Sequence, residues 1–264
     1  MTANSGVALS TFDINCDMGE SLGNWVMGSD EEIMPHITTA NVACGYHGGD
    51  PVTMERTVAL AQRHGVAVGA HPGFPDLRGF GRRRMDLSPE AAAAYVTYQA
   101  GALRGFLDAA GMPLHHIKPH GAFFAFLRDE EAMAEPVAKA IAAFGDDVML
   151  YWPAPAEGIP FCDAVAAEGV EIVPEIYPDL TYAPDGKLVV ERHKKAADPE
   201  FATAQVTQFL RDGTVSATDG SPISLAGSRS ACVHGDAANA VVVAQAVGAA
   251  AEAAGYEVGA VTRG

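Results

Sequence analysis

The sequence predicts an α/β fold of parallel strands alternating with helices, either a TIM-like β/α barrel or a doubly wound sheet. Short apolar runs of strand length recur along the chain, and most are followed by a helical pattern. The 264 residues, 48% of them hydrophobic, suit one β/α barrel or an unusually large doubly wound domain. Five of the runs end in a histidine or carboxylate beside glycine or proline, as catalytic strand ends do in β/α proteins.

The candidate strands are apolar segments bounded by turn residues or by helical patterns. In chain order they are residues 11–15, 41–44, 66–70, 116–118, 148–151, 171–173 and 231–234. Crossover helices between parallel strands would place all the carboxyl ends of these strands on one face.

The predicted helices between the strands carry recognisable start and stop signals. Asp50 followed by Pro51 is a good N-cap for a helix over 52–64, which Gly65 ends. Ser88 and Pro89 repeat this arrangement before a longer helix. The remaining helical patterns complete the alternation, and the predicted helices are 52–64, 90–110, 129–144, 202–211 and 237–254.

Two segments interrupt this alternation. Residues 72–86 form a long loop rich in glycine, proline and arginine, and residues 177–195 contain a Pro-Asp-Gly turn between short apolar stretches. The second segment predicts a small hairpin or lid, and long structured loops in compact domains are usually functional. No linker-like stretch divides the chain, so residues 1–264 are expected to form a single domain.

The bulk composition excludes several partners. A formal charge of −16 disfavours nucleic acid and anionic membrane surfaces. The first residues lack the pattern of a signal peptide, and no apolar window approaches the length of a membrane-spanning helix, which together predict a cytoplasmic protein. None of the four cysteines lies in a CxxC pair, so we interpret them as small buried hydrophobic side chains.

Polar side chains crowd the end of the first predicted strand. Asp13, Asn15 and Asp17 alternate along it and therefore share one face, with Glu20 just beyond. Such a stack inside a barrel is costly unless it is hydrogen-bonded or binds a ligand. Helix caps alone would not need so dense a cluster, so it indicates a functional site.

Other strand ends supply further candidates, and most of them are histidines. Singly, each histidine is more often a structural hydrogen-bonding group than a catalyst, but four at the ends of different strands favour a common site. The loop GFGRR adds the basic side chain Arg82, suited to a carboxylate or phosphate. The other members are His47 with Asp50, His71, Lys118 with His120, and His234 with Asp236.

The sequence leaves a metal site open but contains no nucleotide-binding motif of a known type. Asp and His from several strand ends are the usual ligands of a hydrolytic Zn²⁺ or Mn²⁺ site, yet the same histidines would serve proton transfer and oxyanion binding equally well. A metal is therefore compatible with the sequence but not required by it. For nucleotides, neither GxxxxGK[ST] nor a strand-to-helix GxGxxG is present, so the chain has no recognisable phosphate cradle of its own.

Five blocks of the sequence resemble the LamB/YcsF family. They are DINCDMGES (13–21), TANVACGYHGGD (39–50), GAHPGFPD with GFGRR (69–83), KPHGA (118–122) and CVHGD (232–236), in the family's order. The family comprises the A subunits of prokaryotic ATP-dependent 5-oxoprolinase. The resemblance implies an irregular, polysaccharide-deacetylase-like β/α barrel that opens 5-oxoproline to glutamate. It also implies that ATP acts through a complex with subunits B and C.

The residue pattern and the resemblance together assign roles to the strand-end residues. A carboxylate would activate water, and Lys118 or His120 would stabilise the developing charge. We assign catalysis to Asp13, Asp17, His71, Lys118 and His120. We assign substrate binding to Asn15, Glu20, Asn41, His47, Asp50, Arg82, Glu175, His234 and Asp236.

The chain departs from the family pattern near the presumed pocket, and this leaves the exact lactam open. Phe124 stands in the place of a tyrosine, and Leu180 and Glu191 stand where arginines are usual. Either Arg192 or the arginines of residues 82–84 replace the lost charge, or the substrate is a less acidic lactam. Two other functions remain open: an ATP-independent, metal-dependent amidase or deacetylase, and a lactam-binding subunit without catalytic activity.

Overall fold

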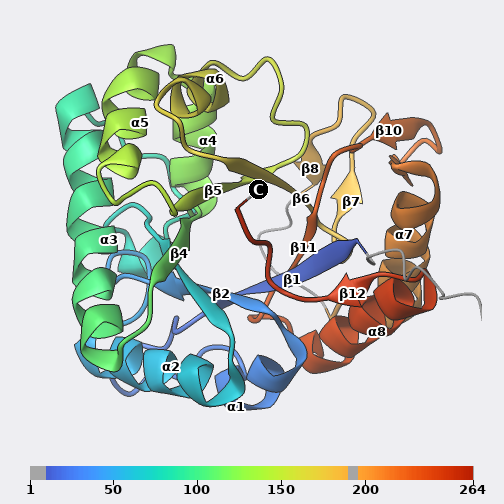
Figure 1. The fold of residues 1–264 in the computed structure, drawn as a ribbon. Coiled ribbons are helices and arrows are strands. Elements are labelled where there is room, and N and C mark those ends of the chain that lie inside the picture. The colour runs from blue at the N-terminus through green and yellow to red at the C-terminus, as the bar shows by residue number, and fades with distance from the viewer. Residues whose placement is uncertain (1–9, 190–195, 264) are drawn as a thin grey trace, which may run out of the picture.

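The computed structural model describes residues 10–189 and 196–263, and within them parallel strands close into a barrel (Figure 1). Each strand of the barrel pairs with the next in parallel register, and the last pairs back onto the first. This confirms the predicted single-domain α/β barrel. The strands are β1 (Thr11–Met18), β2 (Thr39–Ala43), β3 (Ala67–His71), β4 (Leu114–Ile117), β5 (Met149–Pro153), β6 (Ile172–Ile176) and β11 (Ser230–Val233).

Every predicted strand is present, with shifts of a few residues at the ends. The largest shifts are three residues each, in β1, which continues to Met18 rather than ending at residue 15, and in β6, which continues to Ile176 rather than ending at residue 173. Asp17 is therefore part of the strand, on the same face as Asp13 and Asn15. A further short strand, β12 (Glu257–Val258), pairs alongside the start of β1.

Helices surround the barrel and connect its strands. They are α1 (Asp30–Ile33), α2 (Pro51–His64), α3 (Pro89–Ala110), α4 (Gly121–Asp129), α5 (Ala134–Ala142), α6 (Pro160–Ala167), α7 (Pro199–Asp212) and α8 (Ala240–Ala253), with 3-10 turns at Met34–His36, Leu77–Gly79 and Glu131–Met133. The predicted caps of α2 and α3 are confirmed, because Asp50 and Ser88 accept backbone N–H bonds at the first turns.

The predicted helix over residues 129–144 is confirmed only for its middle part, α5, and its predicted start is wrong. Glu130 has φ −112° and ψ 92°, outside the helical region, and a 3-10 turn follows before α5 begins at Ala134. The hydrogen-bonded ladder of α4 therefore ends at Asp129. Helices α4 and α6 were not predicted at all, because neither has a side-chain N-cap hydrogen bond at its start.

The main hydrophobic core lies between the outside of the barrel and the helices. Outward-facing strand residues such as Ile14, Val42 and Ile117 are fully buried there against helical side chains. A smaller cluster of Met149, Tyr151, Val173 and Val261 is separate from this core. Val261 belongs to the C-terminal segment that follows β12, so this segment crosses the end of the barrel where the strands begin. Figure 1 shows the segment reaching the centre of the ring of strands.

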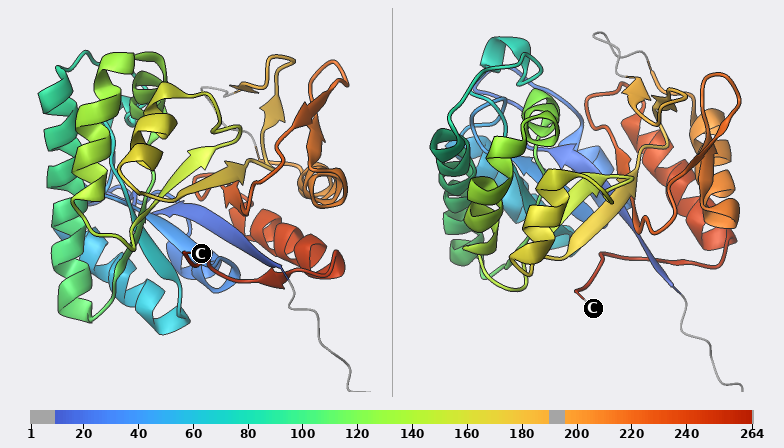
Figure 2. Two further views of the ribbon diagram at one scale, coloured as in Figure 1. Left: turned by 45° about the horizontal axis from the view of Figure 1, so that its top comes forward. Right: turned by 90° about the horizontal axis from the view of Figure 1, so that it is seen from above.

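The predicted hairpin within residues 177–195 is present. β7 (Thr181–Tyr182) and β8 (Leu188–Val189) pair antiparallel across the Pro-Asp-Gly turn, and residues 190–195 lie outside the described part of the chain. A second hairpin, β9 (Thr214–Ser216) with β10 (Pro222–Ser224), packs beside α7, as both panels of Figure 2 show. Whether the first hairpin acts as a lid stays a prediction. Among the described residues, no helix is long and apolar enough to cross a membrane.

Candidate active site

The interior of the barrel is polar, which is the unusual feature of this fold. Asp13, Asn15, Asn41, His116 and Glu175 are all fully buried. Buried polar groups cost free energy unless each finds a hydrogen-bond partner, so the strands must place donors opposite acceptors. The register does so, because side chains from different strands meet in layers along the barrel axis.

The layer farthest from the carboxyl ends of the strands holds Asp13. Its carboxylate accepts hydrogen bonds from the hydroxyls of Thr38, Thr39 and Ser230. Burial raises the pKa of Asp13 against the opposing effect of these bonds. Three hydroxyl donors thus surround the fully buried carboxylate, and the assignment of Asp13 to catalysis stays a prediction.

The middle layer is built around the ammonium of Lys118. Its Nζ lies 3.0 Å from Glu175 Oε2, 2.9 Å from Asn15 Oδ1 and 2.9 Å from Cys232 Sγ. Burial by itself would lower the pKa of Lys118, but the fields of Cys232, Glu175 and Asp17 outweigh it and raise the pKa. Burial raises the pKa of the Cys232 thiol well above its usual range, against the opposing effect of Lys118.

Glu175 and Asn15 complete this layer. Tyr177 donates its hydroxyl to Glu175 Oε1 at 2.5 Å, and Asn15 Nδ2 donates to Glu175 Oε2 at 2.8 Å. Asn41 Nδ2 in turn donates to the Oδ1 atoms of Asn15 and Asp17. The network fixes the orientation of every amide in it and links Lys118 to the carboxylate of Asp17.

His116 was not among the predicted site residues, yet it lies inside the barrel. Its Nε2 donates to Asn41 Oδ1 at 2.7 Å. The ring fits there because its neighbour on β3 is Gly69, where a Cβ atom would come within 2.3 Å of the ring. His116 precedes Lys118 by two residues, and side chains two apart on a strand lie on the same face, so this spacing predicts His116 inside the barrel. The same rule predicts Cys232 inside the barrel from its spacing to His234.

The upper layer, at the carboxyl ends of β1 and β3, gathers imidazoles. His71 Nε2 lies 3.4 Å from Asp17 Oδ1 and 2.9 Å from Nδ1 of His120. The ring of His47 stacks on that of His120 with 3.7 Å between centroids. Asp17 itself retains 13% side-chain exposure, more than Asp13 or Glu175, which are both fully buried. Of the three, Asp17 is the carboxylate that solvent reaches.

The electrostatics of this layer separate ionised groups from neutral ones. Burial alone would raise the pKa of Asp17, but the fields of His71 and Lys118 outweigh it and hold the pKa well below its usual range. Burial, reinforced by His71, lowers the pKa of His120 to about 3, and burial with His120 and His71 also lowers that of His47. At neutral pH the layer therefore holds the Asp17 carboxylate together with the neutral imidazoles of His47 and His120, a combination suited to moving protons.

Glycines in the predicted loop 72–86 make room for His47. A Cβ atom at Gly73 would lie 2.7 Å from His47 Nδ1. At Gly81, where φ is +62°, a Cβ atom would lie 2.6 Å from that of His47. The loop motifs HPGF and GFG are thus explained by close approach of backbone to the imidazole.

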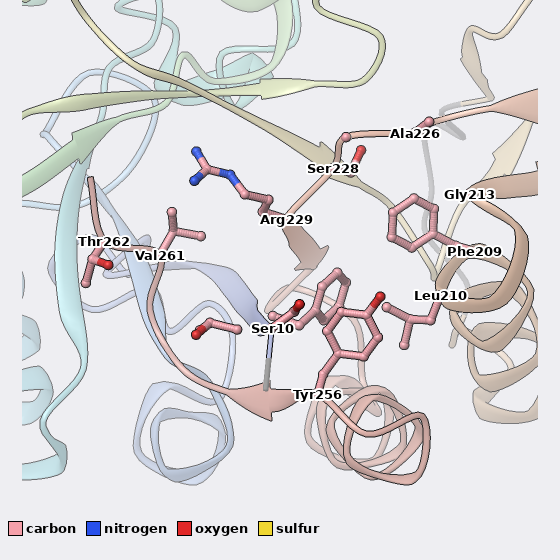
Figure 3. A pocket seen from close by; sticks show the side chains of 13 residues that line it. Ser10, Phe209, Leu210, Gly213, Ala226, Ser228, Arg229, Tyr256, Val261 and Thr262 are labelled. Carbon is pink, nitrogen blue, oxygen red and sulfur yellow. The ribbon is translucent and has the colours of Figure 1, made fainter. Parts of the chain in front are cut away.

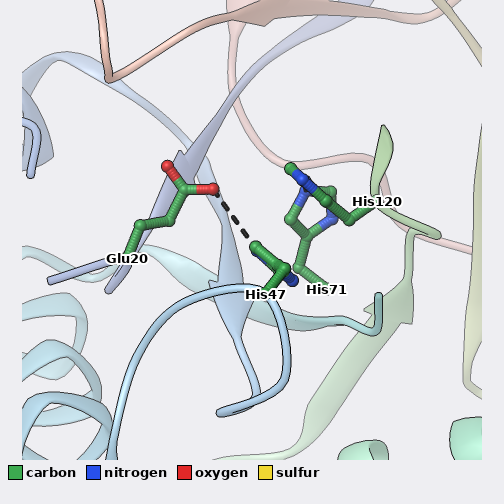
Figure 4. A group of neighbouring side chains, drawn as sticks. All are labelled: Glu20, His47, His71 and His120. Carbon is green, nitrogen blue, oxygen red and sulfur yellow. Dashed lines mark hydrogen bonds and ion pairs between the residues drawn. The ribbon is translucent and has the colours of Figure 1, made fainter. Parts of the chain in front are cut away.

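One group of side chains has the composition of a metal site. Glu20, His47, His71 and His120 each place one potential ligand atom within 4.8 Å of the others, and Figure 4 shows the four side chains converging. Imidazole nitrogen and carboxylate oxygen are ligands that Zn²⁺ and other divalent transition ions accept. This is the only such group among residues 10–189 and 196–263.

The remaining predicted substrate-binding residues lie around the rim. Arg82 pairs with Asp236 at 3.1 Å, and the imidazole Nδ1 of His234 pairs with Asp179 at 2.9 Å. Asp50 instead accepts the backbone N–H groups of Gly23, Val52 and Thr53, so its observed contacts are those of a helix cap and a loop anchor. Its role in substrate binding stays a prediction.

The departures from the family pattern fall in different environments. Phe124 packs on Trp152, with 4.6 Å between ring centroids. Leu180 packs against the hydrophobic core. Glu191 and Arg192 lie outside the described residues.

A pocket of about 550 Å³ opens at the other end of the barrel (Figure 3). It is lined by Ser10, Phe209, Arg229, Tyr256 and Val261 among others, close to the start of β1 and to the residues before β11. None of the predicted site residues lines it. The predicted site therefore belongs to the opposite end, where the strands finish.

Fold and site together define a β/α-barrel protein with a buried lysine–carboxylate network under a cluster of imidazoles. The chain belongs to the LamB/YcsF family, whose model matches residues 12–264. It is 46% identical over 250 residues to the 5-oxoprolinase A subunit of Symbiobacterium thermophilum, covering 94% of each chain. It is 43% identical over 248 residues to the protein of that name from Bordetella pertussis, covering 93% of this chain and 97% of that one.

A solved structure confirms the architecture. The "Lactam Utilization Protein" of Thermus thermophilus superposes with a TM-score of 0.86 at 42% identity, covering 95% of this chain and all of that one. The resemblance found from the five sequence blocks is therefore confirmed over nearly the whole length.

Proposed function

We propose that this chain is the A subunit of an ATP-dependent 5-oxoprolinase, which opens the lactam of 5-oxoproline to glutamate together with subunits B and C. The observation that carries the proposal is the convergence of Asp17, His71, Lys118 and His120 at the carboxyl ends of the strands, in a chain 46% identical to a relative of that name. Such a reaction uses ATP, and so we expect the protein in the cytoplasm.

Ring opening requires water to add to the amide carbon, the C–N bond to break and the ring nitrogen to take a proton. Asp17, ionised and partly exposed, is the carboxylate we assign to accept the proton from water. Lys118, 3.9 Å from Asp17 Oδ1, supplies positive charge beneath the reacting carbonyl, and neutral His47 supplies a donor for the ring nitrogen.

The amide itself is resonance-stabilised, and ATP would activate it by phosphorylating its oxygen. Water addition and C–N cleavage then leave an acyl phosphate of glutamate, and a second water molecule releases phosphate and glutamate from it. The sequence offers no nucleotide cradle, so we assign that step to subunits B and C and the receipt of the activated lactam to this chain.

The division of labour predicts that the isolated chain hydrolyses neither ATP nor 5-oxoproline, while the complex with B and C does both. The measurement is phosphate and glutamate release by each preparation. Robust ATP hydrolysis by the purified chain alone would contradict the assignment. Glutamate release by the chain alone without ATP would instead favour the second candidate function, a metal-dependent amidase. The observation that favours this candidate is the Glu20–His47–His71–His120 group, which has the composition of a metal site.

Arg82 is the arginine we assign to the substrate carboxylate. It lies at the rim over the ring of Phe80, whose carbonyl oxygen accepts from His120, and it forms an ion pair with Asp236. Loss of a charge-assisted hydrogen bond costs about 1.5–3 kcal/mol, or roughly ten- to a hundredfold in affinity.

We therefore expect Arg82→Ala to raise the KM of the complex for 5-oxoproline about ten- to a hundredfold, with a smaller change in kcat. Arg84→Ala is the matched control, because Arg84 is in the same loop but pairs with Glu130 and Asp86 at the surface. Equal effects of the two substitutions on KM would contradict the assignment of Arg82 to substrate binding.

A further inference from the structure

Two hydrogen bonds fix where the protons of His71 and His120 reside. His71 Nδ1 lies 2.7 Å from the carbonyl oxygen of Lys118, and His120 Nε2 lies 2.8 Å from that of Phe80. A carbonyl oxygen only accepts, so each of these nitrogens carries the hydrogen. With one hydrogen on each ring, the other nitrogens, His71 Nε2 and His120 Nδ1, present lone pairs.

These two lone pairs point at each other across 2.9 Å. Two acceptors at that distance repel unless something positive lies between them. Two imidazole nitrogens that each bind one ion at about 2.0–2.1 Å, at an angle between roughly 90° and 109°, are roughly 2.9–3.4 Å apart. The observed separation is therefore that of two neighbouring ligands on one ion. The carbonyl bonds to the outer nitrogens are the supports that metal-binding histidines usually have.

The surroundings supply further ligands and the charge that a cation needs. Asp17 Oδ1 lies 3.4 Å from His71 Nε2, and Glu20 Oε1 lies 3.4 Å from His47 Nε2. Neither ring nitrogen of His47, a residue with 1% exposure, makes a hydrogen bond within the described part of the chain. Since Gly73 lies against Nδ1, Nε2 is the nitrogen that faces Glu20 and the other two histidines.

We propose that His71 Nε2 and His120 Nδ1 are the fixed ligands of one divalent transition-metal ion, completed by carboxylate from the end of β1 and by His47. Zn²⁺ and Mn²⁺ both suit this nitrogen and oxygen ligand set. His47 is the weakest ligand, because its ring is stacked parallel to His120 and must tilt to bring Nε2 onto the ion. The inference does not depend on the lactam reaction, since it rests on the geometry of the side chains alone.

The chain contains a comparison pair without these additional ligands. His115 Nε2 donates to the carbonyl oxygen of Val261 and His116 Nε2 to Asn41 Oδ1, so their Nδ1 atoms also face each other at 2.9 Å. The described residues provide no third histidine, cysteine or carboxylate to form a ligand group there. A shared proton would satisfy this second pair, and the same explanation is the rival for His71 and His120.

The experiment uses the full chain, stripped with a chelator and then equilibrated with Zn²⁺ or Co²⁺ in the absence of substrate and nucleotide. We expect one tightly held ion per chain by elemental analysis, and a visible Co²⁺ absorption of a low-symmetry nitrogen and oxygen site. His71→Gln and His120→Gln should each weaken Zn²⁺ binding at least a hundredfold by titration calorimetry, and His47→Gln about tenfold. Asp17→Asn and Glu20→Gln, compared side by side, identify the carboxylate ligand.

The matched control is His115→Gln, which removes one member of the comparison pair and should leave the stoichiometry at one. Thermal unfolding of each variant establishes that it is folded. A folded wild-type chain that retains no ion would overturn the proposal in favour of the shared proton. An ion that stays bound in both His71→Gln and His120→Gln would overturn it as well, because the site would then lie elsewhere. Neither outcome bears on lactam turnover by the complex, which is measured separately.

Discussion

Replacement of Asp17 by asparagine should lower turnover by the assembled complex about 10²- to 10⁴-fold, with little change in stability. The asparagine keeps an acceptor for Asn41 Nδ2 and nearly the same volume, so the network of β1 stays satisfied. It removes the carboxylate charge that faces His71 at 3.4 Å and Lys118 at 3.9 Å. The measurement is kcat for 5-oxoproline with B and C present, together with the thermal midpoint of the isolated chain.

Asp13→Asn is the matched control, because Asp13 lies on the same face of the same strand four residues earlier. Its carboxylate accepts hydrogen bonds from Thr38, Thr39 and Ser230, a layer below the histidine cluster. We expect this substitution to lower the thermal midpoint and to leave kcat close to that of the wild type. If Asp13→Asn abolished turnover in a folded protein while Asp17→Asn did not, the assignment of the two carboxylates would be reversed.

The barrel was predictable from the sequence because its strands are short apolar runs between clear helix signals. The N-cap Asp50, the proline after it and Gly65 define α2 almost to the residue. The errors arose where those signals are missing. His120 begins α4 without a side-chain cap, and Glu130 leaves the helical region in a segment whose composition still favours helix.

The sequence predicts which residues belong to the candidate site, but not how deep each of them lies along the barrel axis. Residues at the ends of parallel strands must meet, so Asp17, His71 and His120 are together as expected. The sequence could not show that Asp13 lies a layer below them, because that depends on which hydroxyls the neighbouring strands bring opposite it. It could have shown His116, whose two-residue spacing from Lys118 puts both on the inner face of the barrel.

The buried pair of Lys118 and Glu175 leads to the largest expected effect on stability. Their charged atoms are 3.0 Å apart, with side-chain exposures of 4% and 0%. Lys118→Met fills a similar volume but leaves the Glu175 carboxylate buried without its cation, and breaking a buried pair from one side costs about 3–5 kcal/mol. We expect a loss of that size in the free energy of unfolding measured by urea denaturation.

A double-mutant cycle separates the contribution of the Lys118–Glu175 ion pair to stability from the loss of packing around residue 118. Glu175→Gln keeps acceptor and shape for Tyr177 and removes the charge, so Lys118→Met/Glu175→Gln should be more stable than Lys118→Met alone. Tyr177 and Asn15 still donate to the Glu175 carboxylate in Lys118→Met, which places that loss toward the lower end of the range. Glu175→Gln keeps one acceptor oxygen, so the double variant loses the bond from Asn15 Nδ2. Additive losses in the double variant would show that the two charges do not stabilise each other. Lys118 would then be retained in the barrel for the reaction at its upper end rather than for the fold.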